Sequence, residues 1–151
     1  MVESLGWRSD PVRVMMVEAN PALFTVNGRG CGPAIAENSD ATANSASNPV
    51  LAGKFLALFG TGEGLLDGHP DSQRGDVPIE PWLLPVPKLP VRIFAGNEEA
   101  GVVYAGAMPG GRFGKLLIVA QVPGTLKAGC HEVNLRVGRF SSRAGVTVSV
   151  G

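Results

Sequence analysis

The fold is decided by the stretch Gly53-Lys54-Phe55-Leu56-Ala57-Leu58-Phe59-Gly60-Thr61-Gly62-Glu63-Gly64. Its apolar run is too short for a typical helix and is bounded by turn residues, so it predicts a buried strand. The three glycines that follow allow backbone conformations that a Cβ atom disfavours. The same design, a short apolar run followed by a Gly/Pro break, recurs downstream and indicates a β-rich fold.

Other short apolar runs predict further strands at 11–17, 22–26, 33–36, 91–94, 101–105, 115–122, 132–137 and 145–150. Asn27-Gly28 is a strong hairpin signal between the second and third of these runs. Residues 38–48 are rich in Asn, Ser, Thr and Ala and predict an irregular surface loop, and residues 65–90 with six prolines predict a long loop. No stretch shows the periodicity of an amphipathic helix. Many short strands with this punctuation predict an all-β sandwich or barrel.

Composition limits the classes of function. The chain has 151 residues, which suits one domain with an appendage, and its net charge is zero. Neutrality gives no electrostatic reason to bind nucleic acid or an anionic membrane. No apolar run approaches the roughly 20 residues of a membrane span. Residues 1–10 carry Glu3, Arg8 and Asp10 and no apolar core, so they are not a signal peptide.

Two cysteines, Cys31 and Cys130, lie far apart in the sequence. They lack the CxxC spacing of the usual zinc and thioredoxin motifs. In an oxidising compartment they predict a disulfide, and two free thiols are the equally weighted alternative.

Three ordered sequence blocks carry a family resemblance. They are Asn44-Ser45-x-x-Asn48-Pro49 with Gly53 and Leu58-Phe59-Gly60-Thr61-Gly62-x-Gly64; Val103-Tyr104-Ala105-Gly106-x-x-Pro109-Gly110; and Val122-Pro123, Ala128-Gly129 and Val137-Gly138-x-x-Ser141-Ser142. Over residues 20–150 the chain resembles the acidobacterial C-terminal domain family of large exported proteins, which is similar to the IPT/TIG group of immunoglobulin-like domains. It departs from that family at Leu117-Ile118-Val119, where relatives have polar residues, and at both cysteines.

The resemblance implies an exported, non-catalytic, immunoglobulin-like β-sandwich of about seven to nine strands with long Gly/Pro-rich loops. It implies an extracellular or cell-surface location, with this chain a fragment or processed product, and neighbouring domains or other copies of itself as partners. No cofactor, enzymatic activity or catalytic residue follows from it. The core is expected to include Phe24, Phe55, Leu56, Leu58, Ile93, Val103, Leu116, Ile118, Val133, Leu135, Val146 and Val148.

Candidate site residues are few. Asp67, His69 and Asp71 are possible metal ligands, but a solvated acidic loop is the preferred interpretation because such short clusters rarely complete a coordination shell. Trp7 and Trp82 are the only plausible stacking platforms for a glycan, with Trp82 interpreted first as an anchor of its loop to the core. Neither histidine belongs to a Gly-x-Ser-x-Gly elbow or another nucleophilic motif.

The N-terminal arm, residues 1–19, precedes the sandwich domain of residues 20–151. Gly6-x-x-Ser9-x-x-Val12-x-Val14 echoes Gly138-x-x-Ser141 and Val146-x-Val148. In the resembled family such a stretch is the last strand of a domain, so the resemblance implies that residues 6–17 are the last strand of a preceding repeat. Its strand either folds back on its own sheet, is disordered, or adds to the sheet of another subunit through Val12, Val14, Met16 and Val17. The sequence therefore predicts a structural module that spaces, anchors or self-associates into a filament, with a carbohydrate- or ligand-binding module as the alternative.

Overall fold

The chain forms short strands and one 3₁₀ turn, and the computed structural model describes residues 2–4, 6–67 and 76–151. No α-helix occurs within these ranges. The elements are β1 (Glu3–Ser4), β2 (Trp7–Arg8), β3 (Ala22–Leu23), β4 (Gly32–Pro33), β5 (Ala36–Asn38), β6 (Phe55–Thr61), β7 (Leu66–Asp67), η1 (Pro81–Leu83), β8 (Val86–Pro87), β9 (Val91–Ala95), β10 (Glu98–Ala107), β11 (Leu116–Gln121), β12 (Gly129–Val137), β13 (Phe140–Ser141) and β14 (Val146–Val150).

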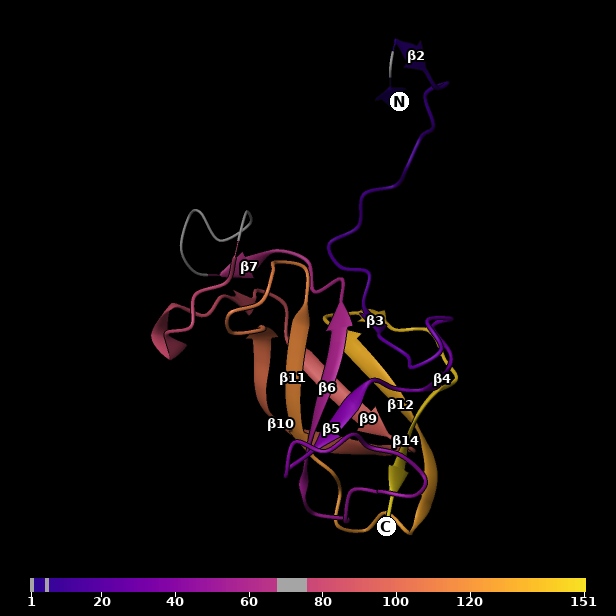
Figure 1. Cartoon of the computed structure of the whole chain (residues 1–151), viewed down its shortest axis with the longest axis vertical. Coiled ribbons are helices and arrows are strands. Elements are labelled where there is room, and N and C mark those ends of the chain that lie inside the picture. The colour runs from indigo at the N-terminus through magenta and orange to yellow at the C-terminus, as the bar shows by residue number, and fades with distance from the viewer. Residues whose placement is uncertain (1, 5, 68–75) are drawn as a thin grey trace.

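The main sheet curls into two layers. Its strand order is β3-β6-β11-β10-β9-β12-β14-β4, with β6, β11 and β10 in one layer and β9, β12 and β14 in the other (Figure 1). Strand β10 belongs to both layers, because Glu98–Ala100 pairs with β9 and Gly101–Ala107 pairs with β11. A register shift between Val102 and Tyr104 marks a bulge at this corner, a common way for a strand to bend between sheets. The predicted all-β, sandwich-like fold is confirmed.

Alternate residues of the long strands fill the space between the layers. The buried members of the expected core are Leu56, Leu58, Ile93, Leu116, Ile118, Val133, Leu135, Val146 and Val148. Phe24, Phe55 and Val103 were also expected there, and the structure corrects this: Phe24 is half-buried and the other two are exposed. Phe55 follows the two-residue period onto the face opposite Leu56, and Val103 stands at the bulge.

The N-terminal segment of the domain borders both layers. The Asn27-Gly28 hairpin is confirmed, since Thr25 bridges Ala34 in antiparallel fashion. The predicted return strand at 33–36 is split in two: β4 pairs in parallel with β14, and β5 pairs with β6. The residues around Gly32–Ala36 thus cross from one layer to the other.

The glycine run after β6 allows the backbone at the base of the arm to pack closely against the end of this strand. Gly62 has φ +81°, and a Cβ atom there would lie 1.9 Å from the carbonyl oxygen of Asn20. The amide of Asn20 donates to the oxygen of Gly62 at 2.9 Å, and Ala19 is buried beside it. These contacts fix the base of the arm against the end of β6. The run continues into β7 and not into a helix, so the glycines are turn glycines and not a phosphate-binding loop.

Candidate functional site

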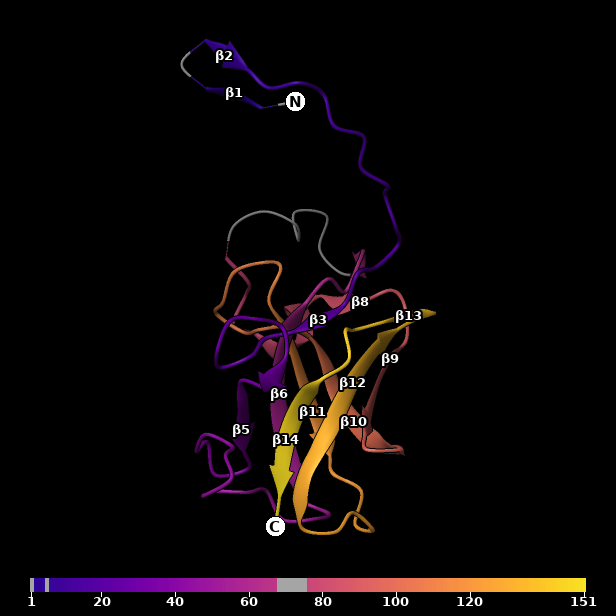
Figure 2. The same cartoon turned by 90° about the vertical axis from the view of Figure 1, so that its right-hand side faces the viewer.

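The arm leaves the sandwich after its anchored base. The structure corrects the predicted strand at 11–17: these residues belong to no strand, and the segment runs away from the domain toward the small β1–β2 hairpin (Figures 1 and 2). Val12, Val14, Met15, Met16 and Val17 have exposed fractions of 51–96%. The arm therefore does not fold back on its own sheet edge, which was one of its three expected fates.

The outer face of the layer formed by β6, β11 and β10 is apolar. Paired positions on this face are Ala57 with Val119 and Phe59 with Leu117. All four side chains are only half-buried. One-sided antiparallel sheets normally carry polar residues on the solvent face, whereas continuous apolar strands are typical of sheets covered on both faces. We refer to this surface, with Phe55 and Val103, as the apolar face.

The other layer presents a charged outer face. Arg92 forms an ion pair with Glu99, and the guanidinium groups of Arg92 and Arg136 lie 5.2 and 4.5 Å from the centroid of the Phe94 ring. The hydrogen bond from Arg92 holds the pKa of Glu99 below its usual value, helped by the nearby charges of Arg92 and Arg136. The outer faces of the two layers thus differ in polarity. The charged face of β9 and β12 is suited to contact with water, whereas the face of β6, β11 and β10 is apolar.

A hollow of about 440 Å³ lies on the apolar face. Its lining combines Phe55, Ala57, Val119 and Val103 with residues of β5 and the loop after it, namely Glu37, Asn38, Ser39 and Ala41. Val103 stands on β10 and is 62% exposed. The hollow therefore crosses the sheet from β5 to β10, the strand at the margin of this layer in Figure 1.

Strand β10 has an open edge opposite β11. The amide of Ala107 donates to the oxygen of Pro85 at 2.9 Å, so this amide points away from β11. Because backbone groups alternate along a strand, the N–H and C=O of Ala105 point the same way. Pro85 thus occupies the edge at Ala107, and among the described residues no strand pairs with β10 on this side between Gly101 and Ala105. The Tyr104 hydroxyl donates to the oxygen of Ala107, and partial burial raises the pKa of Tyr104.

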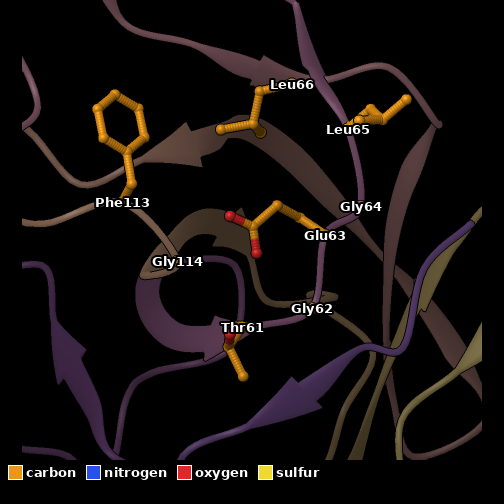
Figure 3. Close-up of a pocket in the computed structure, with 8 residues that line it drawn as sticks. All are labelled: Thr61, Gly62, Glu63, Gly64, Leu65, Leu66, Phe113 and Gly114. Carbon is orange, nitrogen blue, oxygen red and sulfur yellow. The ribbon is translucent and has the colours of Figure 1, made fainter. Parts of the chain in front are cut away.

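A second hollow, of about 320 Å³, surrounds Glu63. It is lined by Thr61–Leu66, Phe113 and Gly114, and the Glu63 side chain projects into it (Figure 3). Glu63 is buried, so its carboxylate is suited to accept hydrogen bonds from a donor that enters the hollow. No sequence motif predicted this site. The available signal was one charged residue inside a run of glycines.

The two tryptophans are exposed at separate elements. Trp7 lies on β2 in the hairpin at the end of the arm and is 84% exposed, and Trp82 lies on η1 and is 81% exposed. The structure corrects the expectation that Trp82 anchors its loop to the core. Both rings are free to stack on a ligand.

The cysteines are separated by a strand. Cys31 precedes β4, Cys130 lies on β12 opposite Ser149, and β14 runs between β4 and β12. Two strand spacings are about 10 Å, beyond the roughly 7 Å that a disulfide spans between Cα atoms. Both cysteines are free thiols, so the structure does not form the expected Cys31–Cys130 bridge.

The candidate metal ligands are only partly described. Asp67 forms an ion pair with Lys88 at 3.5 Å, and His69 and Asp71 lie outside the described residues. Across residues 2–4, 6–67 and 76–151, no group of three or more His, Cys, Asp or Glu side chains is arranged to hold a metal ion. A ring nitrogen of His131 lies 2.7 Å from the backbone oxygen of Lys127.

No helix in the described ranges has the length and apolar content needed to cross a membrane. Comparison of this chain with models of protein families, with curated proteins and with solved structures finds no match.

Proposed function

We propose that this protein is a non-catalytic structural module that self-associates by donating its N-terminal arm to another copy. The observation that carries the proposal is the arm itself: five large apolar side chains between Val12 and Val17 stand in water. A stable single chain gains free energy by covering such residues, at about 25 cal/mol per Å² of apolar surface. Association with a partner that covers these side chains gains this free energy, and an extended segment is able to do so by adding to a sheet edge.

The anchoring of the arm supports this interpretation. Ala19 is buried and Asn20 is hydrogen-bonded to Gly62, so the segment that follows Val17 is held rigidly on the domain. The arm therefore presents its apolar residues from a defined point. The family resemblance supports the same role, because it implies an exported module next to similar domains and an immunoglobulin-like topology.

The experiment compares the full chain with a truncated chain that lacks residues 1–17 and keeps the buried Ala19. We expect concentration-dependent assembly of the full chain in sedimentation velocity, and a folded monomer for the truncated chain over the same concentrations. Circular dichroism shows whether the truncated chain retains its β structure. Equal assembly of both chains, or a strictly monomeric full chain at millimolar concentration, would contradict the proposal.

The second candidate function is glycan binding, and the exposure of Trp7 and Trp82 favours it. Exposed indole rings stack on the apolar faces of sugar rings and keep the indole N–H for a hydrogen bond. A glycan array with the full chain tests this function, and Trp82→Ala and Trp7→Ala identify the ring responsible. Loss of a glycan signal in one variant supports binding, whereas an array without signal removes this candidate.

A further inference from the structure

We propose that the acceptor for the arm is the open edge of β10, between Gly101 and Ala105, on a second copy of the chain. This inference rests on the proposed self-association and assigns the partner surface for it. By strand alternation the N–H and C=O of Ala105 point outward at this edge. The hollow of the apolar face begins beside it at Val103.

The other side of the two-layered sheet, where β14 ends one layer and β6 with β5 ends the other, is already closed. Along β14, the amide of Ala34 donates to Thr147, the side-chain amide of Asn44 bonds both the N–H and the C=O of Ser149, and the amide of Val50 donates to the same oxygen. Beside β6, the amide of Asn44 also donates to Ala36 on the outer side of β5. Strand addition needs unpaired backbone groups, and β10 supplies the N–H and C=O of Ala105.

The full apolar segment 12–17 cannot lie along this edge on its own domain, because its end at Val17 is too far away. β3 and β10 lie on opposite sides of the β6–β11 pair, so a strand added beyond β10 lies four strand spacings, about 19 Å, from β3. Ala19 is fixed beside β6, and Val17 is two residues away, a reach of about 7 Å. Residues 12–17 would therefore lie along β10 only when they come from another copy.

The chemistry of the arm suits both sides of this edge. Alternation places Val12, Val14 and Met16 on one face of the added strand and Arg13, Met15 and Val17 on the other. Val12, Val14 and Met16 would then point between the two layers, where β9 and β10 separate after Ala100. There they would cover the half-buried Val91, Val102 and Ala105. Met15 and Val17 would extend the apolar face of the sheet beyond Val103, and the guanidinium of Arg13 would stay in water.

Each copy then has one donor and one acceptor, which makes the contact head-to-tail. Such a contact closes into a ring or continues as a filament. Two defective copies should therefore complement each other. A copy with a defective edge still donates its intact arm, and a copy with a defective arm still offers its intact edge, so the pair forms one interface.

The test uses three full-length variants with a lysine at an exposed valine. Val14→Lys disables the arm, and Val103→Lys places a charge on the edge, as natural proteins do to block strand pairing. Val26→Lys is the matched control, since Val26 is 70% exposed and Val103 is 62% exposed. We expect Val103→Lys to weaken association at least about tenfold and Val26→Lys to leave it unchanged.

An equimolar mixture of Val14→Lys and Val103→Lys should give a 1:1 heterodimer in sedimentation velocity at a protein concentration where each variant alone is monomeric. If Val14→Lys is monomeric but Val103→Lys assembles like the wild type, the acceptor is elsewhere and only this inference fails. A mixture without heterodimer also overturns it. If Val14→Lys itself assembles like the wild type, the proposed function fails as well.

Discussion

At Gly62, two backbone segments meet at a distance that leaves no room for a side chain. The oxygen of Asn20 lies 1.9 Å from the position that a Cβ atom would take, and φ is +81°, a region that L-amino acids with side chains disfavour. This one residue therefore joins the base of the arm to the end of β6. Its substitution tests whether the arm is anchored as the structure describes.

We expect Gly62→Ala to lower the free energy of unfolding by roughly 3 kcal/mol, since a steric clash adds to backbone strain. Gly28→Ala is the control: φ is +67°, but a Cβ atom there meets nothing within 4 Å, so the loss should be about 1 kcal/mol. Urea denaturation of both variants measures the difference. Equal losses would show that Asn20 does not approach Gly62 this closely.

At the scale of elements, β14 lacks a full neighbouring strand and is completed by a side chain. The Oδ1 of Asn44 accepts from the amide of Ser149 at 2.9 Å, and its Nδ2 donates to the oxygen of the same residue at 2.9 Å. The carboxamide thus copies the donor and acceptor of a backbone unit. This cap closes the edge that would otherwise compete with β10.

Asn44→Asp should lower the free energy of unfolding by about 1–3 kcal/mol, because a carboxylate cannot donate to Ser149 and repels its oxygen. The exposed turn residue Asn97 provides the same chemical change elsewhere, and Asn97→Asp should stay within about 0.5 kcal/mol of the wild type. Chemical denaturation gives the energies, and hydrogen exchange of the Ser149 amide locates the effect. A stable Asn44→Asp variant with a protected Ser149 amide would contradict the capping role.

At the scale of the molecule, charge and apolar surface are distributed unevenly. Net charge is zero, the layer of β9 and β12 carries the arginine and glutamate side chains around Phe94, and the layer of β6 and β11 is apolar outside. Association through the arm and the apolar face therefore depends on apolar burial more than on attraction between charges.

We expect the association constant of the full chain to stay constant or rise when sodium chloride is raised from about 0.1 M to about 1 M, although the Debye length falls from about 10 to 3 Å. Ammonium sulfate should strengthen association, because sulfate favours apolar burial. Sedimentation velocity at fixed protein concentration measures both effects, with the truncated chain as the monomeric control. Weakening by sodium chloride would indicate an electrostatic interface instead.

Local pattern predicted much of the fold, and its failures have physical causes. The period of two identified the inward residues of β11 and β12, among them Ile118 and Leu135, because alternation is a local property of a strand. The candidate site was predicted in part: the apolar arm residues follow from the sequence, but the open edge of β10 does not. That edge depends on a bulge near Val103 and on where β9 and β10 diverge, which are results of non-local pairing.

The sequence by itself determined the all-β class, the Asn27-Gly28 hairpin and the glycine exit from β6, because turns and alternation depend on neighbouring residues. Only the tertiary structure decided that Phe55 and Val103 remain outside, that β14 separates Cys31 from Cys130, and that residues 11–17 pair with no strand of their own domain. Each of these outcomes depends on which strands become neighbours. Strand pairing joins residues far apart in the chain, so one stretch of sequence does not carry the information that selects its partner.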